Sequence, residues 1–375
     1  MSMNSSSSDI KPKYKRLKEH LLKDLAVGRH QIDKPIPSEN ELVKTMGLAR
    51  STVRQALAEL ERDGVIRRVR GKGTFVNNDR EKKARTQARI FALIVPEIER
   101  SDLYPLLIKG FEEVAAENHF QVMVCNTNLD VYKQGNFILQ VIDQNIAGVA
   151  MVTTGFFPTP PSHVRQLQHN HIPVVLCHRA VPETAAPCLM LPREQVGRIA
   201  GQAFVARGHR RIAYFSTRRY PLMESYERGL REVLDRHGQV LSDSHVYYGT
   251  LPTDPDRVPL AKAALTRMMD GPDRPTGIFC SDDSEAEMIY LLLGDLGLKV
   301  PADVSLIGFG SSLRLTSLRS KLTSVTVNEY EIGREAARML FRIREGQEPI
   351  DQAREICVVA ELTLGDTVRT ISENT

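Results

Sequence analysis

Cysteine is scarce in this 375-residue chain. The five cysteines stand far apart, at positions 125, 177, 188, 280 and 357, and no two of them form a Cys-x-x-Cys pair. A scattered, odd-numbered set argues against a disulfide framework and against a zinc site, and it favours buried thiols in a reducing compartment. We therefore predict no metal site.

Long apolar runs are missing as well. No stretch reaches the roughly 20 apolar residues that cross a bilayer, and the serine-rich start carries no hydrophobic signal core. These absences predict a protein of the cytoplasm. The balance of 42% hydrophobic and 26% charged residues is ordinary for a soluble protein, and the length allows two or three domains.

Patterns that carry catalysis are also few. Asp282 and Asp283 are adjacent acids, but no nucleophile, phosphate loop or metal cluster accompanies them. Gly308-Phe-Gly310 suggests a dinucleotide-binding fingerprint, yet Leu313 stands where the third glycine belongs. The sequence therefore predicts no enzyme activity, no catalytic residue and no cofactor.

Positive charge is concentrated at the start of the chain. Residues 1–89 hold 21 Lys and Arg against 11 Asp and Glu, a net charge of +10, whereas the remainder carries −6. A basic first quarter on an acidic body places a polyanionic partner at the N-terminal end. The larger part of the chain is not expected to bind nucleic acid by itself.

Residues 50–64 predict a helix with two different faces. Apolar residues recur at i, i+3, i+4 and i+7, namely Val53, Ala56, Leu57 and Leu60. The opposite face carries cationic and hydrogen-bonding side chains near the N-terminal end: Arg50, Ser51, Arg54 and Gln55. Such a helix is suited to enter the major groove of DNA.

The segments around this helix complete a known pattern. Gly64 ends the helix, and residues 65–70 and 74–76 are expected to be short strands joined by a basic turn at 71–73. Upstream, Ser38 and Glu41 stand at the two positions of a capping box, and Gly47 ends that helix. The order of these elements predicts a winged helix-turn-helix.

Three runs carry a family resemblance: Ile36-Pro-Ser-Glu-Asn-Glu-Leu42, Ser51-Thr-Val-Arg-Gln-Ala-Leu57 and Gly71-Lys-Gly-Thr-Phe-Val76. At this spacing they closely resemble the GntR family of bacterial DNA-binding domains. One departure is Ala49, where the family usually has a capping Ser or Thr, unless Ser51 caps a helix that begins later. Together with the basic face and the turn, the resemblance predicts a set of DNA-binding residues: Ser38, Asn40, Arg50, Ser51, Thr52, Arg54, Gln55, Arg70, Gly71, Lys72 and Gly73.

From Ile90 onward, short apolar strands alternate with helices. This pattern predicts an α/β fold with parallel sheets covered by helices on both faces. The rhythm occurs twice, which predicts two similar lobes with a cleft between them.

Three further runs carry a second resemblance: Gly208-His-Arg-Arg-Ile-Ala213, residues 297–308 and Leu322-Thr-Ser-Val325. They are similar to the effector domain of LacI-type repressors, which has the fold of type I periplasmic sugar-binding proteins. The resemblance implies that the chain crosses between the lobes near residues 177–179, 309–312 and 326–328. We therefore predict a disordered tail (1–12), a DNA-binding domain (13–77), a linker (78–89) and an effector-binding and dimerisation domain (90–375). Lobe 1 would consist of 90–178 and 309–326, and lobe 2 of 179–308 and 327–375.

The LacI-type resemblance also places an effector between the lobes. Asp283 matches the family's effector-binding Asp, whereas Tyr226 stands where the family commonly has Arg, and Pro192 and Gly310 where it usually has Asp. These exchanges favour a more aromatic site. The predicted effector-binding residues are Tyr104, Phe156, His178, Tyr226 and Asp283.

These patterns predict a DNA-binding transcriptional regulator, cytoplasmic and associated with the nucleoid. We expect a homodimeric repressor that binds an inverted repeat in double-stranded operator DNA, answers to a small-molecule effector that could be a sugar, and has no membrane partner. Two alternatives stay open. The body could be an assembly module without a ligand, or a fused aminotransferase-like enzyme, although residues 90–375 offer no lysine in a recognisable cofactor setting.

Overall fold

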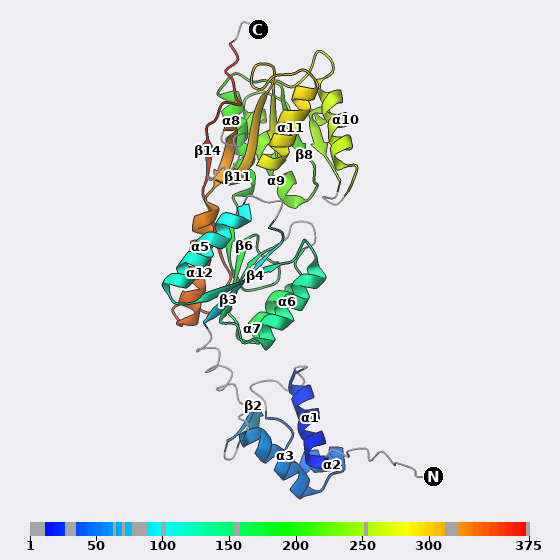
Figure 1. Cartoon of the computed structure of the whole chain (residues 1–375), viewed down its shortest axis with the longest axis vertical. Helices are drawn as coiled ribbons and strands as arrows, with labels where there is room; N and C mark the ends of the chain where they lie inside the picture. Colours follow the sequence, from blue (N-terminus) through cyan, green and yellow to red (C-terminus); the bar gives the residue numbers. More distant parts are fainter. Residues whose placement is uncertain are drawn as a thin grey trace, which may run out of the picture. The chain divides into compact units, whose positions relative to one another are not determined.

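The computed structural model describes residues 12–26, 35–62, 65–69, 72–76, 89–98, 103–153, 158–250, 254–311 and 321–372. The chain divides into two units, Met1–Ala88 and Arg89–Thr375 (Figure 1). Among the residues that the structure describes, no helix is both long enough and apolar enough to span a membrane.

The first unit is a winged helix-turn-helix, as predicted. Its described elements are α1 (Lys13–Ala26), α2 (Glu39–Met46), α3 (Arg50–Arg62) and the antiparallel strands β1 (Ile66–Val69) and β2 (Gly73–Val76). The apolar stripe of α3 is fully buried and packs against leucines of α1 and α2. The opposite face of α3 is left exposed.

The ends of α2 and α3 show which capping signals act. The Ser38 hydroxyl accepts a hydrogen bond from the Glu41 amide, and the Glu41 carboxylate accepts one from the Ser38 amide, which completes the predicted capping box. Gly47 ends α2 with φ 61°. Helix α3 begins at Arg50, and the Ala49 carbonyl accepts from Val53, so the idea that Ser51 caps a later helix is wrong.

Lobe 1 of the second unit is a parallel sheet in the order β13-β7-β6-β5-β3-β4. Its strands are β3 (Ile90–Val95), β4 (Gln121–Asn126), β5 (Gly148–Val152), β6 (Val174–His178), β7 (Pro187–Met190) and β13 (Arg354–Cys357). One face is covered by α5 (Leu103–Glu117) and α12 (Glu329–Arg344), and the other by α6 (Val131–Asp143) and α7 (Pro161–His169) (Figure 1). Strands β5 and β6 are buried along their whole length, as the continuous apolar runs predicted.

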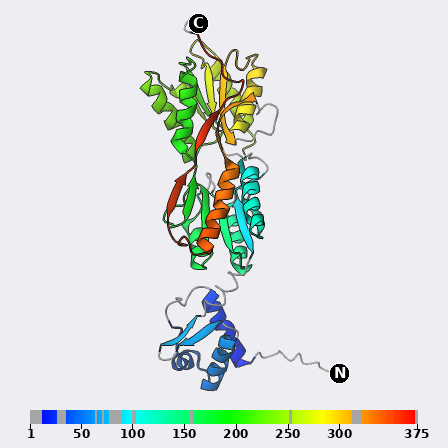
Figure 2. The ribbon, with the colours of Figure 1, turned by 90° about the vertical axis from the view of Figure 1, so that its left-hand side faces the viewer.

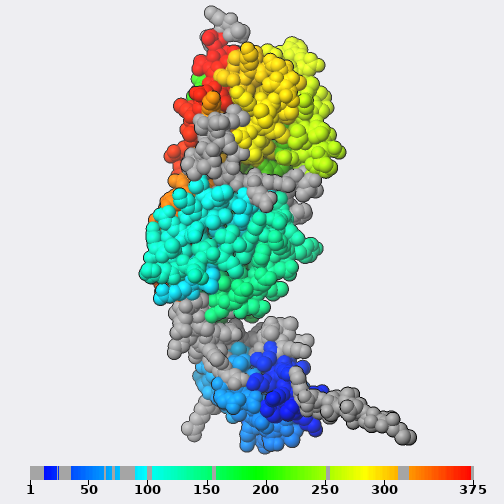
Figure 3. Space-filling view, viewed as in Figure 1, coloured from blue at the N-terminus to red at the C-terminus, as the bar shows by residue number. Residues whose placement is uncertain are grey.

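Lobe 2 repeats this plan in the order β14-β12-β11-β10-β8-β9, with only β14 antiparallel to its neighbour. Its strands are β8 (Ile212–Ser216), β9 (Val246–Tyr248), β10 (Gly277–Cys280), β11 (Ser305–Ser311), β12 (Thr323–Val327) and β14 (Ala360–Thr363). The helices are α8 (Arg193–Val205), α9 (Pro221–Arg236), α10 (Arg257–Met269) and α11 (Asp283–Asp295), with the short 3₁₀ helix η1 (Asp243–His245). In the space-filling view the lobes form separate masses, cyan to green and lime to yellow (Figure 3).

The predicted division of the chain between the lobes is wrong in several segments. Strand β7 pairs with β6 in lobe 1, and β12 pairs with β11 in lobe 2, whereas α12 and β13 belong to lobe 1. The chain therefore crosses after Met190, after Val327 and after Cys357 (Figure 2). Only the crossing expected near 326–328 agrees. An apolar run fits either sheet, because its partner is chosen by long-range pairing that the run itself does not encode.

Each lobe contains a pair of helices in backbone contact at glycines. A Cβ on Gly197 of α8 would lie 1.9 Å from the Tyr226 carbonyl of α9, and one on Gly229 of α9 would lie 1.9 Å from the Glu194 carbonyl. Gly110 and Gly333 play the same part between α5 and α12. Glycine is thus required at both helix crossings for steric reasons.

We predict that Gly197→Ala lowers the free energy of unfolding by about 3 kcal/mol, because the methyl group forces the two helices apart. Gly294→Ala is the matched control, because Gly294 also lies in a helix, α11, and a Cβ there would have no atom within 4 Å. This variant should leave the free energy of unfolding unchanged or raise it by up to about 1 kcal/mol. Urea unfolding of both variants measures the difference. Equal stabilities would contradict the close approach of α8 and α9.

His209 holds the end of the chain against lobe 2. Its ring is fully buried, with Nε2 3.1 Å from the Arg369 carbonyl and Nδ1 3.0 Å from the Thr276 hydroxyl. A carbonyl only accepts, so Nε2 carries the proton and Nδ1 accepts. Burial lowers the pKa of His209 from 6.5 to about 4, which keeps the ring neutral at pH 7.

This burial predicts a stability loss on mild acidification. Between pH 6.5 and about 4 the unfolded chain binds a proton that the folded His209 does not, so unfolding becomes easier as the pH falls through this window. The contribution is fully present above pH 6.5. Thermal unfolding of the His209→Gln variant should show a lower Tm at pH 7 and a smaller drop between pH 7 and 5 than the wild type. The same drop in both proteins would contradict the assignment.

Candidate functional site

The exposed face of α3 brings several predicted DNA-binding side chains together. Arg50, Ser51, Arg54 and Gln55 are exposed on it, and Thr52 is half-buried. Because the apolar stripe anchors the opposite face, these side chains are presented on a rigid helix. Asn40 and the capping residue Ser38 are exposed at the start of α2.

The turn between β1 and β2 supplies the second basic element. Lys72 and Gly73 are exposed there, and the Lys72 amide donates a hydrogen bond to the Val69 carbonyl. Arg70 and Gly71, which were also predicted to face DNA, lie outside the described residues.

Glu39, the first residue of α2, connects the two basic elements. Its Oε2 lies 3.5 Å from Arg54 Nη2 of α3, and its Oε1 lies 3.7 Å from Arg68 Nη2 of β1. Arg68 also pairs with Glu61 at 3.2 Å. Glu39 and Arg68 were not among the predicted site residues, because their pairing depends on how α2, α3 and β1 pack.

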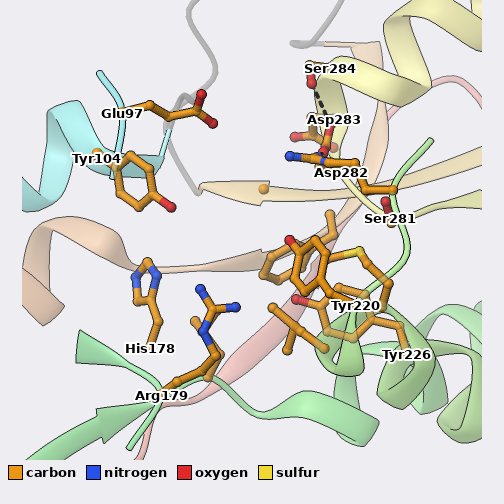
Figure 4. Close-up of a pocket in the computed structure, with 16 residues that line it drawn as sticks. Glu97, Tyr104, His178, Arg179, Tyr220, Tyr226, Ser281, Asp282, Asp283 and Ser284 are labelled. Carbon is orange, nitrogen blue, oxygen red and sulfur yellow. Dashed lines mark hydrogen bonds and ion pairs between the residues drawn. The ribbon is translucent and has the colours of Figure 1, made fainter. Parts of the chain in front are cut away.

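The second unit contains a cleft between its lobes that encloses about 680 Å³, open solvent at its mouth included. Lobe 1 contributes the second residue after β3, helix α5 and the end of β6. Lobe 2 contributes residues at or just after the ends of β8, β10 and β11, with the starts of α9 and α11 (Figure 4). The cleft thus lies at the carboxyl ends of parallel strands from both sheets, which is where open α/β folds bind ligands.

The wall from lobe 1 is aromatic. The ring of Tyr104 stacks on the His178 ring at 5.9 Å between centroids. Behind them, His178 Nε2 lies 3.0 Å from the Glu329 carboxylate, and both groups are almost completely buried. This pair connects the end of β6 to the start of α12. Helix α12 begins just after the chain crosses from lobe 2 to lobe 1, so the pair holds the Tyr104–His178 wall next to this crossing.

The wall from lobe 2 carries two tyrosines, Tyr220 and Tyr226. Burial raises the pKa of Tyr226 well above its ordinary value, so its hydroxyl remains protonated. Among the described residues this hydroxyl has no hydrogen-bond partner, although the side chain is fully buried. A buried hydroxyl without a partner costs free energy that a bound acceptor would recover.

Arg179, which follows β6, is the second group with unused donors. Its Nη2 donates to the Thr153 carbonyl at 2.6 Å, and its guanidinium lies 5.9 Å from the Tyr220 ring across the cleft. Within the part of the chain that the structure describes, its Nε and Nη1 have no hydrogen-bond partner. Arg179 and Tyr226 therefore face the cleft from opposite lobes, each with donors to spare (Figure 4).

The other arginine of the cleft, Arg218, is already neutralised. It forms an ion pair with Asp282, and its Nε lies 3.5 Å from the buried Glu285 carboxylate. Burial opposes its charged form, but Tyr220 and Glu285 outweigh that effect and raise the pKa of Arg218. Asp282 also caps α11 by accepting from the Glu285 amide. Arg218 thus links the segment after β8 to the start of α11 on the lobe 2 side of the cleft.

Asp283 is buried against the neighbouring strands. Its Oδ1 accepts a hydrogen bond from the Ser324 hydroxyl at 2.7 Å. A Cβ on Gly308 would lie 2.2 Å from Asp283 Oδ1, and one on Gly310 would lie 2.3 Å from Oδ2. Gly308 and Gly310 therefore make room for this carboxylate within β11. Because β11 pairs with β12 in the same sheet, the crossing predicted near residues 309–312 is wrong.

Four of the five predicted effector residues line the cleft: Tyr104, His178, Tyr226 and Asp283. Phe156 lies outside the described residues. The remaining lining residues were missed: Glu97, Arg179, Leu191, Arg218, Tyr220, Leu222, Met223, Ser281, Asp282, Ser284, Phe309 and Gly310. For Arg179, Leu191 and Ser281, the position directly after an apolar strand was a signal that could have found them.

Family models match one region in each of the two units. Residues 13–76 match the model "Bacterial regulatory proteins, gntR family". Residues 202–368 match a periplasmic binding protein-like domain.

One relative matches nearly the whole chain, and another matches two thirds of it. The arabinose metabolism transcriptional repressor of Geobacillus stearothermophilus is 28% identical over 96% of this chain and 98% of its own length. Catabolite control protein A of Priestia megaterium is 26% identical over 67% of this chain and 73% of its own length. These proteins are regulators rather than enzymes.

Solved structures share the fold of the second unit. A LacI family transcriptional regulator from Enterococcus faecium with bound ribose has a TM-score of 0.63 at 16% identity, covering 76% of this chain and all of that one. Transcription regulator CcpA of Lactococcus lactis has a TM-score of 0.64 at 18% identity, covering 76% of this chain and all of that one. The solved structures show the fold of the second unit, whereas the family models and the relatives, taken with the winged helix, show a DNA-binding transcriptional regulator that joins a winged helix-turn-helix similar to the gntR family to a periplasmic binding protein-like body.

Proposed function

We propose that the protein is a repressor whose operator binding is controlled by a small, hydroxyl-rich metabolite, a sugar being the leading class, held between the two lobes. The observation that carries this proposal is the pair of unused donor groups, Arg179 and Tyr226, that face one cleft from opposite lobes. The names of the relatives support a sugar, since one is an arabinose metabolism repressor and one structural neighbour holds ribose.

For DNA, we propose that α3 reads bases in the major groove while the turn at Lys72 contacts the backbone or the minor groove. The exposed donors on α3 and the rigid anchoring of its apolar face support this division. We further propose a homodimer on an inverted repeat, because each chain supplies one such helix and two-fold symmetry requires a matching site. Such a protein would act at the nucleoid and would not be an enzyme.

The division of labour predicts different defects for two variants. Arg54→Ala should cost about 1–3 kcal/mol on the operator and relax base preference. Lys72→Ala should weaken all duplexes alike and flatten the dependence of affinity on salt, by about 0.9 in the log–log slope for each phosphate that is no longer neutralised. Titrations of operator and shuffled duplexes at several salt concentrations measure both. Equal, sequence-independent losses would show that the division is wrong.

For the effector, we propose that its oxygen atoms accept hydrogen bonds from Arg179 of lobe 1 and Tyr226 of lobe 2. A ligand held in this way binds best when the lobes are close, so it shifts the equilibrium between lobe arrangements by its differential affinity. Such couplings are typically about 1–3 kcal/mol. Because Arg89 and β3 open lobe 1, the DNA-binding domain is attached to lobe 1, and movement of lobe 1 is what the linker would transmit.

A ligand screen tests this part. A thermal-shift panel of pentoses, hexoses, disaccharides and nucleosides should contain a compound that stabilises the wild type and releases the operator. Arg179→Gln should weaken its binding about 10- to 100-fold, and Tyr226→Phe about 5-fold, as expected for charged and neutral hydrogen bonds. Asp283→Ala should abolish the response and leave operator binding intact.

Arg198→Gln and Tyr248→Phe are the matched controls, because Arg198 pairs with Glu232 and the Tyr248 hydroxyl donates to Glu227, and neither lines the cleft. Both should bind the ligand like the wild type. A ligand that binds the Arg179 and Tyr226 variants normally would disprove the proposed contacts. No stabilising compound in the panel would favour a body that serves only for assembly.

A further inference from the structure

The Glu39 carboxylate lies among the groups that face DNA. It stands at the first turn of α2, yet its two oxygens approach arginines from two other elements: Arg54 of α3 at 3.5 Å and Arg68 of β1 at 3.7 Å. Its side chain is only 23% exposed, whereas Arg54 is 64% exposed. The Glu39 carboxylate therefore lies between α3, the helix proposed to read bases, and β1.

Ion pairs this exposed contribute little to folding stability. These ion pairs matter instead because they restrain the position of a long arginine side chain. An arginine free on an exposed surface takes phosphate oxygens readily, and such contacts carry no sequence information. Base reading instead needs the guanidinium presented in a defined orientation to the edge of a base pair.

We propose that Glu39 is a positioning residue for sequence discrimination: it restrains Arg54 for base contact and lowers the attraction of the whole surface for phosphate. Two consequences follow from its charge and position. Removing the charge strengthens binding to any DNA, because a negative group leaves the neighbourhood of the phosphates. Freeing Arg54 weakens the preference for the operator. This inference rests on the proposed DNA binding.

The experiment uses the full-length protein and two duplexes. The first is the sequence that the wild type selects from a random 30-base-pair pool, and the second is the same sequence shuffled. Dissociation constants are measured for wild type and Glu39→Gln between 50 and 200 mM salt. We expect Glu39→Gln to bind the shuffled duplex about 5-fold more tightly at 100 mM salt, with a steeper salt dependence, and to gain little on the selected duplex. The ratio of the two affinities should therefore fall about 5-fold.

Glu61→Gln is the charge-matched control. Glu61 pairs with Arg68 at 3.2 Å, closer than Glu39 does, and its only ion pair among the described residues is with Arg68. A general effect of removing one negative charge would appear in both variants, whereas a lower ratio of the affinities for the selected and the shuffled duplex should appear only in Glu39→Gln. Glu39→Asp, which keeps the charge at α2, should retain the wild-type salt dependence and part of the discrimination.

A combination with Arg54→Ala tests the route of the effect. If Glu39 acts through Arg54, adding Glu39→Gln to Arg54→Ala should not change the base preference any further. Thermal unfolding of each variant within about 2 °C of the wild type excludes a change of fold as the cause.

The outcomes separate this inference from the proposed function. A wild type that selects no sequence from the pool would overturn both. A wild type that selects a sequence, with Glu39→Gln showing the same affinity ratio or the same defect as Glu61→Gln, would overturn the role of Glu39 alone. A reduced ratio for Glu39→Gln only, abolished in the Arg54→Ala background, is the expected result.

Discussion

The carboxyl ends of two parallel sheets, turned toward one cleft, are the constraint on which the second unit depends. Side chains at these ends come from segments as distant in sequence as Glu97 and Phe309, and they meet only because the chain passes three times between the lobes. Every group that could hold a ligand is therefore placed by strand pairing rather than by local sequence. The same arrangement makes the relative position of the lobes the natural variable for a ligand to change.

The charges in the cleft are divided between structure and recognition. The charge of Arg218 is matched by Asp282 and Glu285, and His178 is paired with Glu329, although Arg218 Nε and Glu329 Oε1 have no hydrogen-bond partner among the described residues. Removing one partner of such a pair would leave a buried charge or polar group uncompensated, which lowers the stability of the fold. Arg179 and Tyr226 retain unused donors in the described part of the chain. We therefore infer that a ligand completes these two groups, while the paired groups keep the walls rigid.

The DNA-binding domain also contains an acidic residue that pairs with arginines, but at an exposed surface. Its core fixes α3 against α1 and α2, and a single carboxylate then lies between the cations of α3 and β1. Here water and salt weaken each ion pair, so the gain is orientation and charge balance rather than stability. The two units thus use acidic residues differently, as buried partners in the cleft and as a restraint at the DNA-facing surface.

The sequence by itself determined the local elements. The period of Val53, Ala56, Leu57 and Leu60, the capping box at Ser38 and Glu41, and the buried runs of the parallel strands are set by neighbours a few residues apart, and the structure confirms each of them. The resemblance of short motifs extended this to the two folds. It also led to four of the residues that line the cleft.

Only the tertiary structure decided how distant segments combine. The lobe assignment of 179–190, of the described residues within 309–326 and of 328–357 was wrong, whereas β14 lies in lobe 2 as predicted. Short apolar runs such as β7 and β12 fit either sheet, and long-range pairing selects one. Arg179, Arg218 and Glu39 could not be identified for the same reason, because the partners that give them their roles lie 15 to 67 residues away in the sequence. A sequence pattern encodes periodicity and caps, whereas the meeting of such side chains depends on the packing of whole elements.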